Sequence, residues 1–280
     1  MSRERCAPGE AAAGGARTAH ASPAQDRSAT GLVHSFDTFG TVDGPGIRFV
    51  LFMQGCALRC GYCHNPDTWD RCAGKPMTTD DVLQEIEPYL DYYRLSGGGL
   101  TVSGGEPTLQ APFVAALMRE AKRRFGLHTA LDTSGFCEPA QAEASGLLDA
   151  ADLVLLDIKH SDSKQHAGLT TQPNERILRF AFHLSRRGSP FWVRHVLVPG
   201  VTDGERHLRA LGGLIGKLSG VQQIELLPYH RMGIYKWQAL GIPYPLEGVP
   251  VPSGKEMERA RAIVLEAARR VSGGKSKNAE

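Results

Sequence analysis

The sequence predicts an α/β fold in which six parallel strands are each followed by a helix. Strand-like apolar runs alternate with longer segments of helical periodicity from residue 47 to residue 270, and short connections join them. Polar motifs follow the strand-like runs, where parallel α/β proteins place their active sites. Six such units make an incomplete (β/α)6 barrel, although the count alone also permits an open, doubly wound sheet.

The individual elements follow from their residue patterns. Residues 47–53 are rich in β-branched and aromatic side chains, which favours a first parallel strand. Five further strand-like runs are found at residues 99–103, 127–132, 152–158, 191–198 and 222–228. Helical patterns are found at residues 79–93, 111–125, 139–149, 174–187, 205–218 and 254–270. Residues 31–46 precede the first parallel strand, and the turn-forming run at 42–46 indicates a short added hairpin.

The two ends of the chain are expected to be disordered tails. Residues 1–31 contain no Leu, Ile, Val, Phe, Tyr or Trp, so they cannot bury enough apolar surface to fold. They also lack the continuous apolar region of a secretory signal. Residues 272–280 read as a second, shorter tail. The folded domain is therefore expected to span residues 32–271.

Composition limits the class of protein and its partners. A chain of 280 residues can bury one sizeable core, and its net charge of +2 gives no electrostatic footprint for nucleic acid or an anionic membrane. No apolar run approaches the roughly 18 residues that a membrane helix needs. Of six cysteines, three lie in one loop and Cys6, Cys72 and Cys137 are scattered, which indicates a reducing cytoplasm.

The loop after the first parallel strand carries Cys56, Cys60 and Cys63, with the spacing Cys-x3-Cys-x2-Cys. Three thiolates on one loop can hold a [4Fe–4S] cubane and leave its fourth iron open to a chelating substrate. Two other interpretations remain open from the loop alone. Cys60, Cys63 and His64 could contribute to a zinc site, and a secreted chain could use these cysteines in a structural disulfide.

Polar side chains follow the next strands at comparable positions. The run Ser-Gly-Gly-Glu-Pro at 103–107 exposes backbone groups and permits close approach of a ligand, although an ordinary tight turn explains it equally well. Asp132 ends the third strand and could instead cap the helix near residue 139. Asp157 and Lys159 alternate on the fourth strand, so both can face the barrel mouth or form an ion pair on its rim.

The last two predicted strands place a guanidinium and an imidazole near the same rim. Arg194 stands in a strongly apolar strand, where an unpaired buried charge would be costly, so its side chain must face the rim or a partner. His230 follows the sixth strand directly, and a surface histidine is the alternative interpretation. Six polar motifs on one rim are not expected of a structural module held together by zinc.

These motifs resemble those of the radical S-adenosylmethionine (SAM) enzymes, in which SAM binds the open iron of the cluster. From about residue 32 to the last helix, the chain is similar to one family among them, the pyruvate formate-lyase activating enzymes, which are glycyl-radical enzyme activases. The matching stretches are HSF at 34–36, GTVDGPGIRF at 40–49, YCHN at 62–65, DTW at 67–69, LDT at 131–133, DIK at 157–159 and IELLPYH at 224–230.

The resemblance implies a TIM-like, incomplete (β/α)6 barrel of the radical SAM type and a role for each matching residue. Cys56, Cys60 and Cys63 would ligate one [4Fe–4S] cluster. The residues expected to contact SAM are Tyr62, Cys63, His64, Gly105, Asp157, Ile158, Lys159 and His230. Asp132 would help to hold a monovalent cation beside the SAM carboxylate. Asp43 and Arg194 match residues near the target peptide, and we assign them to catalysis together with Lys159.

The implied reaction is reductive cleavage of SAM, followed by abstraction of a glycine Cα hydrogen from pyruvate formate-lyase under anaerobic conditions. A flavodoxin-like or ferredoxin-like protein would supply the electron, and the chain is expected to be a monomer. Activases of other glycyl-radical enzymes, such as diol or glycerol dehydratases, often carry an inserted ferredoxin-like domain with extra cysteines. Only Cys72 lies between Cys63 and Gly104, so no such insertion is present. A non-catalytic zinc-binding interaction module is the alternative from another class.

The chain departs from the family pattern at two positions of the predicted site. Ser134 stands where asparagine usually follows Asp-Thr. Leu155 stands where a relative has methionine, but that position contributes its backbone carbonyl to the cation, so the exchange puts little in doubt. Residues 1–31 have no recognised counterpart.

Overall fold

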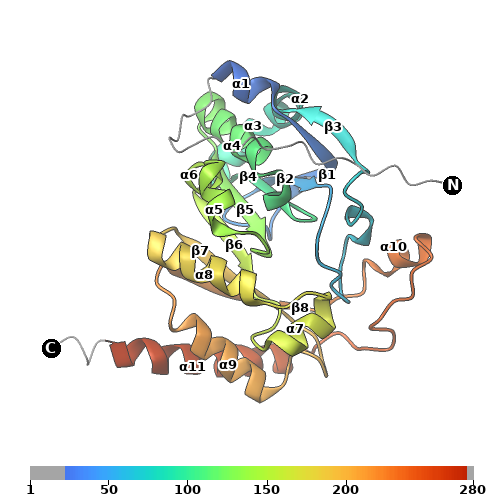
Figure 1. The fold of residues 1–280 in the computed structure, drawn as a ribbon, viewed down its shortest axis with the longest axis vertical. Helices are drawn as coiled ribbons and strands as arrows, with labels where there is room; N and C mark the ends of the chain where they lie inside the picture. Colours follow the sequence, from blue (N-terminus) through green and yellow to red (C-terminus); the bar gives the residue numbers. More distant parts are fainter. Residues whose placement is uncertain (1–22, 276–280) are drawn as a thin grey trace.

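The computed structural model describes residues 23–275, which are built around one curved sheet with the strand order β3-β1-β2-β4-β5-β6-β7-β8 (Figure 1). Six consecutive strands of this order run parallel to one another: β2 (Arg48–Met53), β4 (Gly99–Gly104), β5 (His128–Thr133), β6 (Leu153–Asp157), β7 (Phe191–Leu197) and β8 (Val221–Pro228). The end strands β3 and β8 are not neighbours in the order, so the sheet does not close. The prediction of an incomplete (β/α)6 barrel is confirmed.

Two antiparallel strands extend the sheet beyond β2. The long strand β1 (Thr30–Gly40) pairs with β2, which confirms the predicted hairpin with residues 41–47 as its connection. The short strand β3 (Lys75–Thr78) pairs with the first residues of β1, from Thr30 to Val33. The sequence analysis missed β3 because four residues that include a proline carry no strand pattern.

The expected N-terminal tail, residues 1–31, includes residues that are folded in the structure. Helix α1 (Pro23–Ser28) and the start of β1 lie within residues 1–31. Asp26 is only 5% exposed and accepts two hydrogen bonds from the guanidinium of Arg119, at 2.7 and 2.6 Å. A short polar segment without large apolar side chains is thus anchored by a partner distant in sequence. Residues 1–22, including Cys6, lie outside the described part of the chain.

The C-terminal boundary also differs from the expectation. Helix α11 (Gly254–Lys275) continues through the first four residues of the expected tail at 272–280. Ser272 Oγ donates to the carbonyls of Ala268, at 3.0 Å, and of Gly216, at 3.3 Å, so the last turns remain bonded to the helix and to its neighbour. Residues 276–280 are not described.

The helices between the strands agree with the predicted segments, with breaks where the backbone requires them. The segment at 79–93 forms α2 (Thr79–Ile86), a 3-10 turn η2 (Glu87–Tyr89) and α3 (Leu90–Ser96), because Pro88 has no N–H to donate within a continuous helix. The segment at 139–149 forms α5 (Pro139–Ala144) and α6 (Leu147–Ala150), separated by Gly146 with a φ of +71°.

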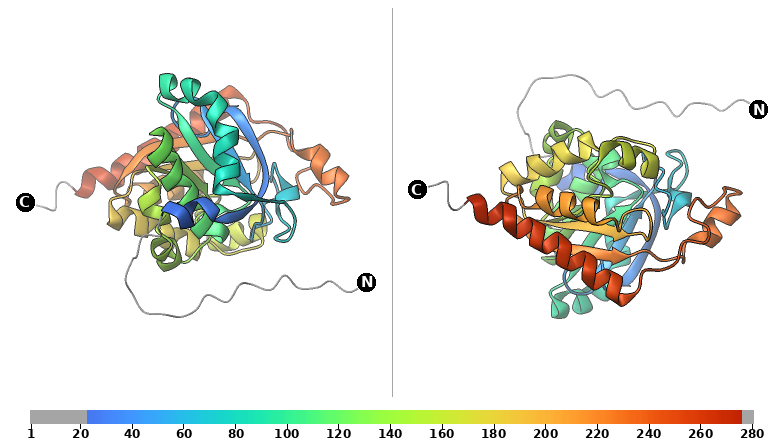
Figure 2. Two further views of the ribbon diagram at one scale, coloured as in Figure 1. Left: turned by 90° about the horizontal axis from the view of Figure 1, so that it is seen from above. Right: turned by 90° about the horizontal axis from the view of Figure 1, so that it is seen from below.

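The remaining helices cover the outer face of the barrel or follow its last strands. Those at predicted positions are α4 (Ala111–Phe125), α8 (Glu175–Arg187) and α9 (Glu205–Ile215). Those not predicted are α7 (Ser163–Thr170), α10 (Ile234–Ala239) and the 3-10 turns η1 (Pro66–Thr68) and η3 (Pro107–Gln110). Helix α11 runs alongside α9, as Figure 2 shows, and a Cβ on Gly212 would lie 2.3 Å from the carbonyl oxygen of Val264. Among the described residues, no helix combines the length and apolar character that a membrane crossing requires.

The pleat of the parallel strands places charges at the mouth of the barrel. Ala130, Leu155 and the partly buried Trp192 share a small cluster that is separate from the main core between sheet and helices. Because side chains alternate along a strand, the residue two positions further on each of these strands faces the same side. Those residues are Asp132, Asp157 and Arg194. The barrel interior is therefore apolar at one level and charged at the carboxyl ends of its strands.

Candidate active site

The cysteine loop leaves the end of β2 and is tied to η1 and to the end of α7 by three backbone hydrogen bonds. Gly55 N donates to Thr68 O at 2.7 Å, Arg59 N to Thr170 O at 2.8 Å, and Gly61 N to Leu169 O at 2.9 Å. Cys56, Cys60 and Cys63 all carry free thiols, and they pack together around the buried side chain of Leu58. The structure therefore brings the three predicted cluster ligands together.

The donor set, three free thiols on one loop, fits an iron–sulfur cluster. Burial raises the pKa of Cys56 and Cys60 to about 12 and that of Cys63 to about 11, although the Lys159 ammonium acts in the opposite direction on all three. These thiols therefore ionise only when a metal takes the place of the proton. In a cubane each of the three thiolates would bind a different iron.

Three residues that the sequence analysis did not single out brace the loop from behind. Arg59 donates to the carbonyls of Cys56 and Leu58, both at 2.9 Å, and its guanidinium lies 5.0 Å from the ring of Trp69. The indole N–H of Trp237 donates to Cys63 O at 2.9 Å. Since the hydrogen bonds from Arg59 and Trp237 end on backbone carbonyls, they position the loop without occupying the thiols.

The glycine-rich turn after β4 packs directly against the cysteine loop. A Cβ on Gly105 would lie 2.2 Å from Gly55 O and 3.3 Å from the Cβ of Cys56. Gly104 has a φ of +113°, which L-residues with side chains rarely adopt. Residues 103–107 therefore form a tight turn, which was the alternative interpretation of this run, and the turn also lies against the loop that carries the thiols.

Glu106 is a site residue that the sequence analysis overlooked. Its carboxylate is 1% exposed and accepts hydrogen bonds from Thr108, from the Thr133 hydroxyl at 2.5 Å, and from both N and Oγ of Ser134, at 3.0 and 2.5 Å. It thereby joins the ends of β4 and β5. The acid directly after the glycine pair was the available signal. Ser134, which departs from the family pattern, still supplies two donors to this carboxylate.

Four predicted charged residues meet at the carboxyl ends of β5, β6 and β7. Lys159 Nζ lies 2.8 Å from Asp157 Oδ2, so the rim ion pair considered for these two residues is formed. Arg194 Nη1 lies 3.3 Å from Asp132 Oδ1, and Arg194 Nε lies 3.4 Å from Glu225 Oε2. The hydroxyl of Ser103 donates to the other oxygen of Asp132 at 2.6 Å.

Two carboxylates of this network, Asp132 and Asp157, have pKa values shifted in opposite directions. Burial raises the pKa of Asp132 to about 6, even though Arg194 opposes it. Burial would also raise the pKa of Asp157, but Lys159 and Arg194 outweigh it and hold that pKa below its ordinary value. Asp157 is therefore ionised at neutral pH, while Asp132 titrates just below it.

Several buried polar atoms in this region lack a hydrogen-bond partner. They include Tyr62 Oη, Asp132 Oδ1, Arg194 Nε and Glu225 Oε2, because the two contacts of Arg194 are ion pairs without hydrogen-bond alignment. Buried polar groups in proteins are nearly always hydrogen-bonded, to protein, water or ligand. Unsatisfied oxygens and a guanidinium at one barrel mouth fit a polar, charged ligand or a bound cation.

The hairpin connection brings Asp43 to the same network. Thr101 Oγ1 donates to Asp43 O at 2.7 Å, and Arg194 Nη2 lies 3.4 Å from the carbonyl oxygen of Val42. Burial raises the pKa of Asp43, and the charge of Arg194 partly offsets this effect. The structure thus places the two residues matched to the target peptide side by side.

The other residues predicted to contact SAM differ in how accessible the structure leaves them. The rings of His64 and His230 meet edge to face, 5.0 Å apart, so the cysteine loop and the end of β8 adjoin there. Ile158 is 1% exposed, its N–H donates to Arg194 O, and its carbonyl accepts from His195 Nδ1 at 2.7 Å. Ile158 therefore has both backbone groups already bonded, and its side chain belongs to the core.

Comparisons with known proteins support the prediction of an iron–sulfur site. Residues 42–177 match the family model described as 4Fe-4S single cluster domain. The fold resembles a radical SAM methyltransferase from Sphaerobacter thermophilus, with a TM-score of 0.56 and 16% identity over 81% of this chain and 69% of that chain. This second likeness concerns the fold alone.

The sequence relatives are more specific. A pyruvate formate-lyase-activating enzyme of Staphylococcus epidermidis is 49% identical over 239 residues, which cover 84% of this chain and 95% of the relative. The crystal structure of a domain of pyruvate-formate lyase-activating enzyme from Bacteroides vulgatus matches with a TM-score of 0.51 and 25% identity, over 61% of this chain and 95% of that chain. This chain belongs to the family of pyruvate formate-lyase-activating enzymes.

Proposed function

We propose that this chain generates a glycyl radical on a pyruvate formate-lyase. In the proposed reaction one electron and SAM give methionine and a 5′-deoxyadenosyl radical, which takes a hydrogen atom from a glycine Cα and becomes 5′-deoxyadenosine. Charge and atoms balance, since the sulfonium accepts the electron and the hydrogen moves with its own electron. The cluster, held by Cys56, Cys60 and Cys63, would supply the electron transfer and the open iron.

The observation that carries the proposal is the meeting of the three free thiols with a charged, partly unsatisfied barrel mouth. Lys159 acts on the pKa of every thiol of the loop and also pairs with Asp157. A zwitterionic ligand such as SAM needs acceptors for its amino group and a cationic partner for its carboxylate. Asp157 and a monovalent cation held by Asp132 Oδ1 would provide them.

The residues proposed for the peptide lie on the other side of the same network. Asp43 and Arg194 adjoin through the carbonyl of Val42, and Val42 itself is 68% exposed. The sheet does not close between β3 and β8. A barrel with an open side suits a protein loop better than a small metabolite, which a closed barrel could enclose.

Electron paramagnetic resonance tests the proposal. The cluster-loaded chain is reduced, mixed anaerobically with SAM and a pyruvate formate-lyase, and frozen. A glycine-centred doublet is expected, with about one 5′-deoxyadenosine formed per radical. Cleavage of SAM without a radical on the partner, or on any other glycyl-radical enzyme, would contradict the activase function. If the doublet forms on a different glycyl-radical enzyme and not on pyruvate formate-lyase, the proposed partner is wrong but the reaction class stands.

A further inference from the structure

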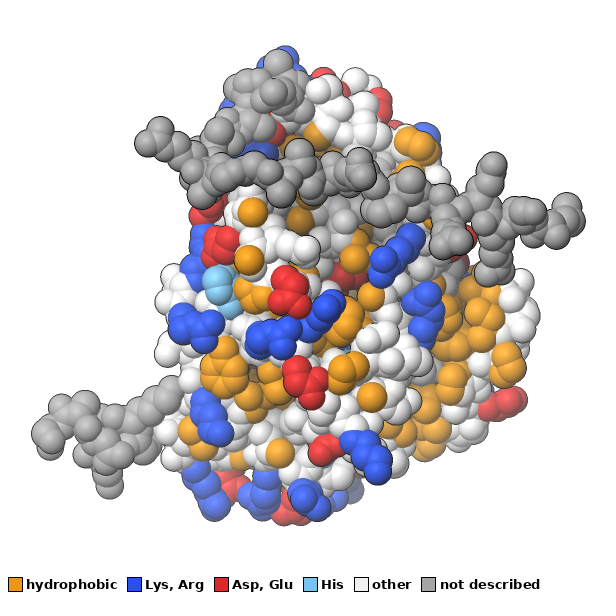
Figure 3. All heavy atoms as spheres, in the orientation of Figure 1, with side chains coloured by type: hydrophobic (Ala, Val, Ile, Leu, Met, Phe, Trp, Pro, Cys, Tyr) orange, Lys and Arg blue, Asp and Glu red, His pale blue; other side chains and the backbone are white. Residues whose placement is uncertain are grey.

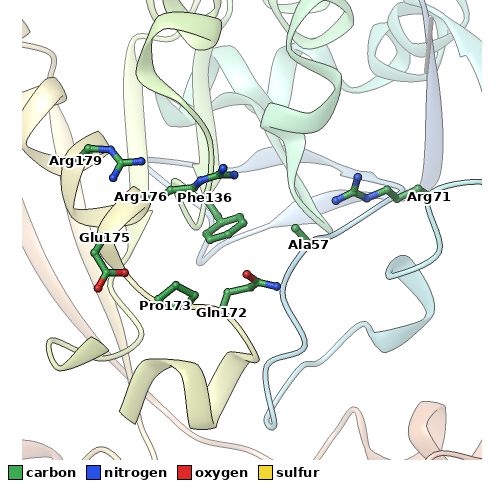
Figure 4. A pocket seen from close by; sticks show the side chains of 8 residues that line it. All are labelled: Ala57, Arg71, Phe136, Gln172, Pro173, Glu175, Arg176 and Arg179. Carbon is green, nitrogen blue, oxygen red and sulfur yellow. The ribbon is translucent and has the colours of Figure 1, made fainter. Parts of the chain in front are cut away.

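An open pocket of about 510 Å³ lies between the cysteine loop and the start of α8 (Figure 4). Ala57, which follows the first cluster cysteine, forms one wall, and Phe136 lies across from it. The Phe136 ring packs against the cluster of Cys56, Leu58 and Cys60. The pocket therefore borders the group of side chains that contains two of the cluster cysteines. None of its lining residues belongs to the set predicted to contact SAM or the peptide.

Three guanidinium groups surround this pocket. Figure 4 shows Arg176 and Arg179 on one side and Arg71 pointing inward from the other. Arg176 and Arg179 share one carboxylate, that of Glu138, at 3.1 and 3.2 Å, and their side chains are 49% and 54% exposed. The two arginines therefore keep a net positive charge that faces solvent.

One acidic residue, Glu175, also lines the pocket and accepts a hydrogen bond from Ser163 at 2.6 Å. With Arg71 included, three guanidinium groups stand against the carboxylates of Glu138 and Glu175, which leaves an excess of one positive charge. In the orientation of Figure 1, where α8 lies at the front, Figure 3 shows Lys and Arg side chains across the middle of the face, with apolar and a few acidic side chains between them. Basic residues around apolar surface are complementary to an acidic protein with an apolar contact area.

We propose that this arginine-lined pocket is the docking site for a small acidic protein that delivers one electron to the cluster. The inference rests on the proposed function, which requires a reduced cluster. In the step, the reduced carrier loses one electron and the oxidised cluster gains it, with no bond or proton transferred. The barrel mouth is reserved for SAM and the peptide. The pocket offers the carrier a second approach, past Ala57 and Phe136.

The test uses the cluster-loaded chain and a fully reduced flavodoxin as the acidic carrier. The pocket variant carries Arg176→Glu and Arg179→Glu. The matched control carries Arg259→Glu and Arg270→Glu on α11, where the side chains are 68% and 70% exposed and paired with Glu205 and Glu266. Two quantities are measured at low salt: the Kd of the complex, by fluorescence anisotropy of a labelled carrier, and the second-order rate constant of cluster reduction, by stopped flow.

In the pocket variant the Kd is expected to rise, and the rate constant to fall, by at least about tenfold. In the control both quantities should stay within about twofold of those of the parent chain. At about 0.5 M salt the difference between the pocket variant and the parent chain should become smaller, because screening removes long-range attraction between exposed charges. The charge-conserving pair Arg176→Lys and Arg179→Lys should remain within about threefold. An unchanged pocket variant, or equal losses in the control, would overturn the docking site.

A small uncharged reductant separates this inference from the proposed function. Photoreduced deazaflavin needs no docking surface, so it should reduce the cluster at the same rate in the parent chain, the pocket variant and the control. SAM cleavage should then proceed equally in all three. If deazaflavin supports no SAM cleavage in any of them, the proposed function fails, whatever the flavodoxin result. A loss with deazaflavin in the pocket variant alone would show damage to the cluster and overturn the docking interpretation.

Discussion

The guanidinium of Arg194 lies 3.3 Å from the carboxylate of Asp132, across the barrel mouth from β7 to β5. Even this close cation leaves the pKa of Asp132 raised to about 6, because burial outweighs the attraction. The same guanidinium lies 3.4 Å from Glu225 and 3.4 Å from the carbonyl oxygen of Val42. Arg194 therefore links the proposed cation site with the proposed peptide site.

The raised pKa of Asp132 predicts a pH dependence of stability with a definite sign. The carboxyl binds its proton more tightly in the folded chain, at a pKa of about 6, than in the unfolded chain, at about 3.9. Its contribution to stability is therefore present below about pH 4 and lost as the pH rises to about 6. Asp132→Asn should match the parent chain near pH 4 and be more stable at pH 7, by up to about 3 kcal/mol.

Urea unfolding of the cluster-free chain between pH 4 and pH 7.5 measures this difference. Histidines titrate over the same range, so the quantity of interest is the variant minus the parent at each pH. The same substitution should weaken SAM binding to the cluster-loaded chain and remove its response to potassium or sodium. A variant that is less stable than the parent at pH 7 would contradict the raised pKa.

Arg194→Ala should separate peptide handling from SAM cleavage. The side chain contacts the backbone next to Asp43, so its loss should slow glycyl-radical formation more than the uncoupled cleavage of SAM. Radical yield by paramagnetic resonance and 5′-deoxyadenosine by chromatography give the two rates. Arg194→Lys keeps the charge without the planar fork and should lie between the parent and Arg194→Ala. Equal losses in both rates would assign Arg194 to the SAM side of the network.

Cluster binding should depend on the three loop cysteines and on no other buried thiol. Cys56→Ala, Cys60→Ala and Cys63→Ala should each lower the iron content per chain after anaerobic reconstitution to a small fraction of that of the parent. Cys137→Ala is the matched control, because Cys137 is also free and buried and follows Phe136, which packs against the loop. Normal iron content in a loop variant, or its loss in the control, would contradict the assignment.

Glu106 should contribute more to stability than its single charge suggests. Glu106→Gln replaces one carboxylate oxygen by an NH2 group that faces donors, so at least one hydrogen bond is lost and buried groups are left unpaired. We expect a loss of about 3 kcal/mol and a fall in Tm of about 5–10 °C. Ser134→Ala removes one donor and keeps the backbone N–H, so it should cost about 1 kcal/mol. Thermal melts with the reverse ranking would contradict the network.

The N-terminal helix should stabilise the chain through Asp26. Asp26→Ala removes both hydrogen bonds to Arg119 and should lower the free energy of unfolding by about 1–3 kcal/mol. Arg27→Ala is the control, because its side chain is 50% exposed and lies 3.7 Å from Glu120, so it should cost less than about 0.5 kcal/mol. Equal effects in chemical denaturation would show that α1 does not contribute through this pair.

Local sequence patterns predicted much of the architecture. The alternation of strand and helix periods predicted all six parallel strands and the helices α4, α8 and α9, since apolar periodicity reflects which face a segment buries. The breaks at Pro88 and Gly146 were overlooked, although each residue alone signals one. Strand β3 and helix α1 could not be predicted, because short polar segments are stabilised by partners distant in sequence, such as Arg119 for Asp26.

The sequence by itself predicted which residues come together at the site. The spacing of Cys56, Cys60 and Cys63, the polar residues at the strand ends and the family resemblance together proposed the cluster ligands and most of the charged site. Only the tertiary structure decided how these groups act on one another. The pKa of Asp132, the bracing of the loop by Arg59 and Trp237, and the bonds that converge on Glu106 depend on distances and burial. Those quantities arise only when strands far apart in sequence are packed side by side, because the energies of charges and hydrogen bonds depend on their surroundings.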